Sequence, residues 1–349
     1  MVRLGAMGDI LHALPAVTAL RKMHPRWVID WVVEPMWGAL LTAQSGSARD
    51  TDEAFPSQPV VDGVLFASTR KWRHHLLARE TRKEIGELRR VLNRGAYDAV
   101  IDFQGAVRSA LIGRMAKSRR YIGEAKPREG AAKLLFTERV ATRGVHVIEQ
   151  DIEVAQAIAG DQLNPVYPML PFDPEAEKWA EGLMADAGGA PAVLINPGAG
   201  WGAKRWPVER YADVARALLN RGYRVFVNAG PGEVVLADTI VKRTGGGAVS
   251  LLCSIEQLIA ITRCVRLAIA GDTGPLHLAC ALGRPVVGIY GPTDPSRNGP
   301  FGTRFKVLRN PESRRDHSRR EEPEAGLLTI SVEDVLEAAE GLLYSETTQ

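Results

Sequence analysis

A strand-to-helix turn late in the chain carries residues suited to binding an anion. The run 271–277 reads GDTGPLH and directly follows the apolar run 267–270. Gly274 permits a tight turn, and Pro275 suits a first helical position because it lacks the N–H that would be unpaired there. The remaining amides point outward at the positive end of the helix dipole, so the turn predicts a diphosphate site with His277 at its mouth. An ordinary turn with a capping Asp or Thr is the weaker interpretation.

Two further glycine-rich turns follow apolar runs in the same half. The stretch 196–207, NPGAGWGAKRWP, follows the expected strand 193–196, and its glycines expose backbone amides beside Lys204, a point charge for phosphate. A surface loop with a stray lysine is the alternative. The stretch 228–233 follows another strand, and Glu233 there could accept the two hydroxyls of a ribose, although an exposed turn glutamate is commoner.

The amino-terminal run 4–12, LGAMGDILH, follows a very short strand and opens a helix. It has only two glycines, so it does not match the dinucleotide fingerprint, which weighs against a dehydrogenase. Asp9 lies where the strand ends and the helix begins, and a carboxylate there could accept a proton from an attacking hydroxyl. A helix-capping aspartate is the competing interpretation, and spacing alone favours it.

The charge distribution indicates an acidic partner for the first half. Residues 1–150 carry 24 Lys and Arg against 16 Asp and Glu, whereas residues 151–349 carry 20 against 25. Cations cluster beside an aromatic residue at 69–75, TRKWRHH, and Arg128 lies in a second basic run. This pattern fits a phosphorylated lipid, an acidic sugar or a nucleic acid, and equally a solvated basic face. The aromatic content of 6% and the lack of a known binding motif disfavour nucleic acid.

Acidic and cysteine residues do not predict a bound metal. Asp50 and Asp52 have the spacing of a metal-binding carboxylate pair, but the polar stretch 44–52 has no β-rich run before it, so we expect a surface loop. The chain has three cysteines, Cys253, Cys264 and Cys280, and no two of them have the short spacing of a disulfide or zinc motif. We therefore expect reduced thiols, as in a cytoplasmic protein.

Length and composition predict a soluble α/β protein of two domains. The 349 residues are 45% apolar and 24% charged, with no membrane-length apolar run and no export signal. Strands are expected at 28–33, 63–67, 97–102, 120–123, 193–196, 223–228, 249–252, 267–270, 286–290 and 306–308. Helices are expected at 208–221, 255–264 and 331–344, the last capped by Ser331. The proline-rich stretch 164–173 predicts a junction near residue 170, and the charged stretch 310–325 predicts a loose loop.

In this order the motifs resemble those of the ADP-heptose:lipopolysaccharide heptosyltransferases, a family of inverting glycosyltransferases with the GT-B fold. The resemblance covers nearly the whole chain through Met7-Gly8-Asp9 with His12 and Pro15, the run 197–207, Asp272-Thr273-Gly274 with His277, and the run 291–295. It implies two Rossmann-like parallel-sheet domains facing across a cleft. Residues 1–170 would bind the acceptor and 171–330 the ADP-sugar, with a helix in 331–349 packing back on the amino-terminal domain.

The resemblance also implies the roles of individual residues. Asp9 would be the general base on the acceptor hydroxyl. The implied donor site holds phosphate with Lys204 and the backbone of Thr273 and Gly274, ribose with Glu233, and the heptose–diphosphate end with Asp272 and His277. Ala199 and Gly200 replace two threonines of some members, so contacts there must come from backbone amides. The acceptor's carboxylates and phosphates would meet Arg70, Lys71, Arg73 and Arg128, and no metal or other cofactor is implied.

Within the family the motifs look most like heptosyltransferase I, which adds the first heptose to Kdo-lipid A, with heptosyltransferase II as runner-up. We therefore expect heptose transfer from ADP-heptose, by a cytoplasmic protein peripheral to the inner membrane. A nucleotide-sugar epimerase and a noncatalytic sugar-nucleotide or lipid A-binding module are the alternatives. Family members usually have several more apolar residues before the equivalent of Arg3, so we expect a stunted first strand and a natural start upstream of Met1 or a trimmed chain.

Overall fold

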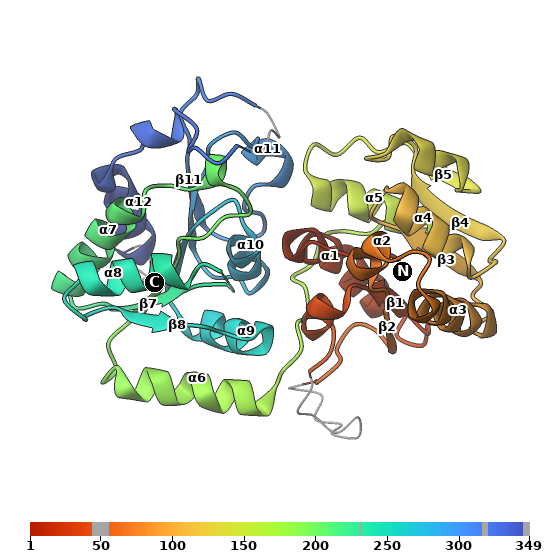
Figure 1. The fold of residues 1–349 in the computed structure, drawn as a ribbon, viewed down its shortest axis with the longest axis horizontal. Helices are drawn as coiled ribbons and strands as arrows, with labels where there is room; N and C mark the ends of the chain where they lie inside the picture. The colour runs from red at the N-terminus through yellow and green to blue at the C-terminus, as the bar shows by residue number, and fades with distance from the viewer. Residues whose placement is uncertain (44–55, 231, 316–319, 345–349) are drawn as a thin grey trace. The chain divides into compact units, whose positions relative to one another are not determined.

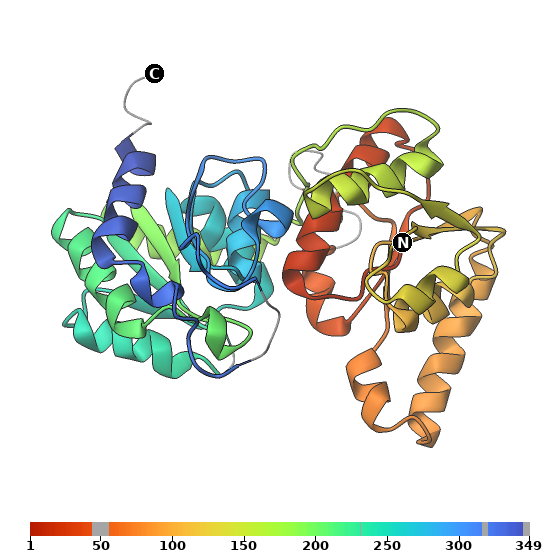
Figure 2. The same cartoon turned by 90° about the horizontal axis from the view of Figure 1, so that it is seen from above.

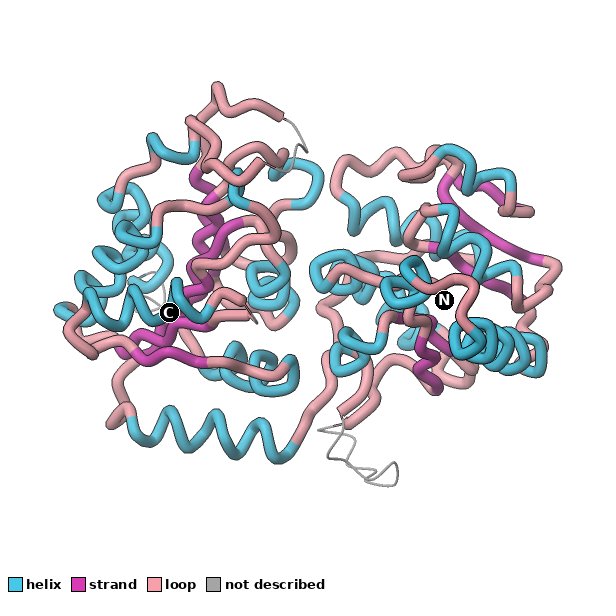
Figure 3. Tube along the Cα trace, viewed as in Figure 1, coloured by secondary structure: helices cyan, strands magenta, loops and turns pink. Residues whose placement is uncertain are grey.

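The computed structural model describes residues 1–43, 56–230, 232–315 and 320–344, and it divides the chain into two compact units. Unit 1 comprises Met1–Pro171 and unit 2 comprises Phe172–Gln349, so the division falls in the proline-rich stretch. In each unit the strands lie between helices (Figures 1 and 3). The expected α/β class with two parallel sheets is confirmed.

Unit 1 contains a parallel sheet whose central strand is reduced to one bridging residue. Its strands are β1 (Asp30–Val33), β2 (Gly63–Phe66), β3 (Ala99–Asp102), β4 (Arg120–Glu124) and β5 (Glu138–Val140). Val2 forms parallel bridges to both Val32 and Asp102, and so joins the β1–β2 pair to the β3–β4–β5 group. Counted along the chain with Val2 first, the spatial order is 3-2-1-4-5-6, the order of a dinucleotide-binding Rossmann sheet.

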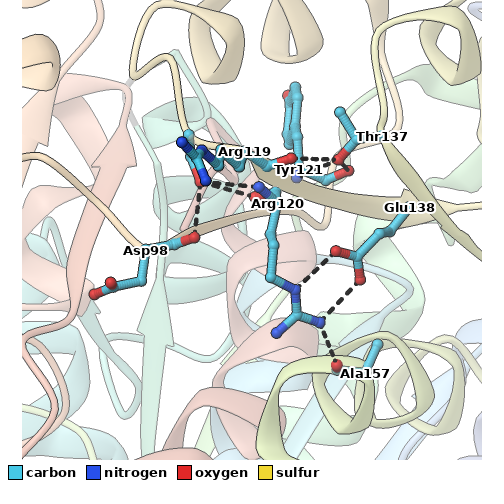
Figure 4. A network of polar contacts seen from close by, with 8 residues as sticks. Asp98, Arg119, Arg120, Tyr121, Thr137, Glu138 and Ala157 are labelled. Atoms are coloured by element: carbon cyan, nitrogen blue, oxygen red, sulfur yellow. Dashed lines mark hydrogen bonds and ion pairs between the residues drawn. The ribbon is translucent and has the colours of Figure 1, made fainter.

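Helices and side-chain contacts hold this sheet in place. The helices of unit 1 are α1 (Met7–Met23), α2 (Thr69–His74), α3 (Arg79–Arg94), α4 (Val107–Arg114) and α5 (Val147–Ala159). The α1 helix packs against α5 and is buried over most of its length. Arg120 donates two hydrogen bonds to Glu138, at 2.7 and 2.9 Å, and one of 2.9 Å to the Ala157 carbonyl (Figure 4). One guanidinium therefore ties β4, β5 and α5 together.

Unit 2 has the same strand order in a continuous six-stranded parallel sheet. Its strands are β6 (Ala192–Asn196), β7 (Arg224–Asn228), β8 (Val249–Leu251), β9 (Leu267–Gly271), β10 (Val286–Ile289) and β11 (Phe305–Leu308). They are arranged β11-β10-β9-β6-β7-β8. Every residue of β6, β9 and β10 is buried, as expected for a parallel sheet covered on both faces.

The helices of unit 2 are α6 (Pro174–Asp186), α7 (Val208–Asn220), α8 (Val234–Arg243), α9 (Ile255–Cys264), α10 (Gly274–Ala281), α11 (Pro295–Asn298) and α12 (Val332–Tyr344). Within the described ranges, every helix of either unit is too short or too polar to span a bilayer. The strand order reverses between β6 and β9. Ligands of such sheets bind outside the carboxyl ends of the strands at this reversal, which directs attention to the residues following β6 and β9.

The carboxy-terminal helix α12 covers the sheet of unit 2. Ser331 caps α12 as expected, because its Oγ accepts a 3.0 Å hydrogen bond from the Asp334 N–H. The helix packs on its own unit. It contacts α7, β9, β10 and β11, and Val335 and Ala339 are fully buried in the hydrophobic core of unit 2. The apolar stripe of α12 thus covers the sheet of its own unit.

Candidate functional site

A buried ion pair lies at the reversal of strand order in unit 2. Lys204 ends a short 3₁₀ turn, Gly202–Lys204, that follows β6, and Asp272 directly follows β9. The Lys204 ammonium donates to the Asp272 carboxylate and lies 3.5 Å from the Asp272 carbonyl oxygen. It also lies 4.3 Å from the centre of the Trp201 ring, a cation–π contact that further stabilises the charge. Two motifs far apart in sequence therefore meet at the point where the fold predicts a ligand.

Asp272 is held as a carboxylate by its neighbours. His277 Nε2 lies 3.3 Å from Asp272 Oδ1, and Asn298 Nδ2 donates to the same oxygen over 3.4 Å. Burial acts to raise the pKa of Asp272, but the His277 hydrogen bond and the Lys204 charge outweigh it, so the pKa is well below its usual range. The site therefore presents a fixed negative acceptor for hydroxyl groups beside a cation for phosphate.

The amino terminus of α10 follows Asp272, and the helix begins at Gly274 as the sequence predicted. Pro275 lies in its first turn, and Thr273 is the preceding cap residue. Thr273 Oγ1 donates to the Gly271 carbonyl over 3.2 Å, and no side chain of a described residue caps the helix. The first amides of α10 are thus available to an anion, next to Lys204 and Asp272.

Glu233 is fitted against the first glycine-rich turn. A Cβ atom at Gly198 would overlap with the Glu233 carboxylate in its present position, so glycine leaves room for this approach. Glu233 Oε2 accepts a 3.2 Å hydrogen bond from the Gly230 N–H, which aims the carboxylate across the ends of β6 and β7. Ala199 is buried behind the turn and Gly200 is exposed on it. The sequence identified Glu233, but it gave no sign that Gly198 makes room for it.

A segment near the carboxyl terminus of the chain also supports this site. The Ala203 N–H donates to the Arg320 carbonyl over 2.9 Å, and the Glu324 N–H donates to the Ala203 carbonyl over 3.2 Å. A Cβ atom at Gly202 would overlap with the Glu321 backbone. The expectation of a loose loop at 310–325 is therefore wrong for residues 320–324, which run over the turn that carries Lys204 and hold it through backbone hydrogen bonds.

In unit 1, Asp9 lies in the first turn of α1, beyond the end of the Val2 strand position. Its Oδ2 accepts a 3.1 Å hydrogen bond from the Ala6 N–H, and its Oδ1 lies 3.4 Å from Arg3 Nη2. Asp9 is therefore the third residue of the helix, bonded back to the cap residue's N–H, and not the cap itself. Its side chain is nevertheless 37% exposed, so the carboxylate is fixed in direction and open to a substrate.

A second carboxyl group, missed by the sequence analysis, lies behind Asp9. Asp151 on α5 is buried, and its Oδ2 makes no hydrogen bond with the described part of the chain. Burial raises the pKa of Asp151 to about 7, an effect that the Arg3 charge opposes and that the Asp9 and Glu124 charges increase. Asp151 gives no sequence signal, because it is one of three acidic residues in the helix, with Glu149 and Glu153, and nothing in the sequence marks it as the buried one.

The cations expected to meet the acceptor have different surroundings. Lys71 is bound to Glu84 at 2.8 Å and to Glu80 at 3.3 Å, and the Glu84 hydrogen bond raises its pKa. Arg70 Nη1 lies 3.1 Å from the sulfur of Met36, and Arg73 lies 3.4 Å from the His74 ring. Arg128 is exposed on a loop after β4, away from α2 in the sequence. The structure thus places Lys71 in an α2–α3 contact and leaves the three arginines exposed or partly exposed.

The two aspartates that have the spacing of a metal-binding pair are not described by the structure. Asp50 and Asp52 lie outside the described residues. Within the described ranges there is no group of three or more His, Cys, Asp or Glu side chains arranged to hold a metal ion. The donor candidates gather in unit 2 and Asp9 lies in unit 1.

The buried Asp151 carboxyl group predicts a pH dependence of stability. Its pKa is about 7 in the folded chain and 3.8 in the unfolded chain, so the folded state binds more protons between these values. Its contribution to stability is therefore largest at low pH and falls as the pH rises to about 7. We expect the free energy of unfolding of Asp151→Asn, relative to the parent chain, to rise by about 3 kcal/mol between about pH 5 and about pH 8.

Urea unfolding at several pH values measures this difference. Asp186→Asn, a change at an exposed aspartate of α6, is the matched control and should follow the parent chain. Parallel stability curves for Asp151→Asn and the parent chain would contradict the assignment.

Comparison with known proteins shows which family this chain resembles in sequence and fold. The model of glycosyltransferase family 9 (heptosyltransferase) matches residues 85–328. The chain is 29% identical to lipopolysaccharide heptosyltransferase 1 of Escherichia coli, covering 89% of this chain and 93% of that protein. It is 25% identical to lipopolysaccharide heptosyltransferase 2 of Escherichia coli, covering 97% of each. A solved structure of an Escherichia coli heptosyltransferase with ADP superimposes with a TM-score of 0.79 at 25% identity, over 98% of each chain.

These similarities confirm the expected GT-B fold and account for the Rossmann order of both sheets. They agree with the resemblance carried by the motifs around Asp9, Lys204 and Asp272. The family match covers more than half of the chain. The chain belongs to glycosyltransferase family 9, the heptosyltransferase family, and is a glycosyltransferase.

Proposed function

We propose that this chain transfers heptose from ADP-heptose to Kdo-lipid A, with inversion at the anomeric carbon, as a heptosyltransferase I at the cytoplasmic face of the inner membrane. The observation that carries the proposal is the Lys204–Asp272 pair beside the uncapped start of α10. The cation and the helix amides can bind a diphosphate, and the carboxylate can accept hydrogen bonds from sugar hydroxyls. Relatives of the chain are named lipopolysaccharide heptosyltransferases, which supports both the sugar and the acceptor class.

The donor is held by unit 2. Lys204 has three N–H donors. One is directed to the Asp272 carboxylate and a second, over 3.5 Å, to the Asp272 carbonyl oxygen, so one remains for a phosphate oxygen. The α10 amides at Gly274 add dipolar stabilisation to the same oxygens. Glu233, at the ends of β6 and β7, accepts the two ribose hydroxyls. In the transition state the leaving diphosphate gains negative charge, and the preorganised ammonium and amides stabilise that charge.

The acceptor hydroxyl is activated by Asp9. The Ala6 N–H and Arg3 orient the carboxylate, and its exposed edge accepts the proton as the new glycosidic bond forms. The exposed Arg70, Arg73 and Arg128 supply positive charge for the acceptor's carboxylates and phosphates.

Purified protein incubated with ADP-heptose and Kdo-lipid A tests the proposal. Mass spectrometry of the lipid should show the addition of one heptose. Transfer only to an acceptor that already carries a heptose would instead indicate heptosyltransferase II. Isomerised sugar formed without acceptor would indicate an epimerase, and ADP-heptose binding without ADP release would indicate a binding module.

Asp9→Ala removes the proposed base. We expect turnover to fall by about 10²–10⁴-fold, because the acceptor hydroxyl loses its proton acceptor, while ADP binding stays close to that of the parent chain. Initial rates and calorimetric titration with ADP measure the two quantities. Asp161→Ala, at an exposed position of unit 1, is the control. Near-normal turnover by Asp9→Ala would refute the assignment of the base.

Lys204→Met removes the phosphate cation and keeps a similar side-chain length. We expect kcat to fall by about 10²–10³-fold, because one stabilising donor to the leaving diphosphate is lost, and ADP binding to weaken. Lys242→Met, at an exposed position near the end of α8, should change neither. ADP affinity equal to that of the parent chain would show that Lys204 serves Asp272 alone.

A further inference from the structure

The turn between α2 and α3 exposes two leucines at its tip. Leu76 and Leu77 have 61% and 81% of their surface exposed. The turn is closed by a 3.0 Å hydrogen bond from the Ala78 N–H to the His75 carbonyl, which puts the leucines at its two central positions. Figure 2 shows the two helices, in orange, meeting at a tight loop that points away from the rest of unit 1. We call residues 75–78 the leucine turn.

The leucine turn is supported from below. Trp72 is buried under it, and its Nε1 donates a 2.7 Å hydrogen bond to Glu84 on α3. Lys71 bridges α2 to the same glutamate at 2.8 Å. Leu88 and Leu92 of α3 lie with Trp72 in the hydrophobic core of unit 1. The two helices are thus fixed to each other and to the unit, so the exposure of the leucines is a property of the folded state.

Positive charge surrounds these leucines. Residues 70–83 carry six Lys and Arg against one Glu, and that Glu80 is paired with Lys71. Neither Arg79 nor Arg82, which follow the turn, forms an ion pair with any residue that the structure describes. An apolar tip within a ring of cations is the pattern of a segment that lies in the headgroup region of an anionic bilayer.

We propose that the leucine turn and its surrounding arginines dock this protein on an anionic lipid bilayer. The leucines enter the boundary between headgroups and acyl chains, and Arg79 and Arg82 bind lipid phosphates. A nucleic acid fits less well, because base stacking needs exposed aromatic rings and Trp72 is buried. A second copy of the chain also fits less well, because the like-charged surroundings of the two turns would repel each other.

The position of α2 connects this surface to the proposed acceptor chemistry, and this step rests on the proposed function. The Arg70 N–H donates a 3.1 Å hydrogen bond to Glu34, the residue that follows β1, so α2 begins at the carboxyl edge of the sheet. Asp9 follows the Val2 strand position at that same edge. A lipid-linked acceptor lying in the docked bilayer would therefore present its sugar near the end of unit 1 that carries the proposed base.

Sedimentation with vesicles tests the docking of the full chain. The vesicles contain phosphatidylglycerol and phosphatidylethanolamine, or phosphatidylcholine alone, in about 0.1 M salt. We expect binding to the anionic vesicles only, weakening as salt is added. The double change Leu76→Ser and Leu77→Ser should lower the partition constant by about tenfold or more, since two apolar side chains no longer enter the bilayer. Arg79→Gln should lower it by about fivefold.

Leu252→Ser is the matched control, because Leu252 is an exposed leucine of unit 2 with 64% of its surface exposed. It should bind vesicles like the parent chain. Unchanged binding by both the leucine double variant and Arg79→Gln, or equal binding to phosphatidylcholine, would overturn the proposal. So would a dimer in sedimentation velocity that the leucine double variant abolishes.

A second readout separates docking from catalysis. Heptose transfer to a deacylated, water-soluble acceptor should be unchanged in the leucine double variant and lost in Asp9→Ala, whereas vesicle binding should show the opposite pattern. Loss of transfer to the soluble acceptor in the leucine double variant would show that the turn serves the active site and would overturn the docking role. Failure of the parent chain to transfer heptose, with vesicle binding intact, would refute only the proposed function.

Discussion

The structure of unit 2 depends on bringing one lysine and one aspartate together inside the protein. Two buried charges lose the hydration that water gives them, and only close, well-directed contacts offset that loss. Lys204 and Asp272 achieve this through the strand order, which makes β6 and β9 neighbours, and through Trp201, His277 and Asn298 around them. Removal of Lys204 would leave the buried Asp272 carboxylate without its closest cation, and removal of Asp272 would leave the ammonium without its carboxylate, so both motifs are constrained together.

Most of the fold followed from local patterns. The ten expected strands exist, with ends that shift by at most a few residues, and the helix over 255–264 has the expected bounds. The strand β5 was missed because its three residues, ERV, are too few and too polar to show alternation. The apolar stripe of α12 revealed that one face is buried but not which surface covers it, since periodicity carries no information about the partner.

The sequence predicted the candidate site only where the residues that carry the chemistry lie close together in one segment. The turn before α10 has its glycine, proline and histidine within a few residues, and the structure places a helix start there. Other features of the site join segments that lie apart in the sequence. Glu233 fits against Gly198, residues 320–324 run over the turn that carries Lys204, and Lys71 binds Glu84. No single-sequence pattern encodes such contacts, because each depends on the completed fold.

If the Lys204–Asp272 pair holds the donor as proposed, one site can serve two parts of a sugar nucleotide. In the structure each charge satisfies the other. An arriving diphosphate competes with Asp272 for the ammonium, and a proton donor on the sugar competes with Lys204 for the carboxylate. His277 and Asn298 still bind Asp272 Oδ1, so the carboxylate stays in place as its contact with Lys204 loosens. A ligand that offers phosphate and hydroxyl groups together replaces both halves of the contact, whereas one that offers only phosphate leaves Asp272 buried with fewer partners.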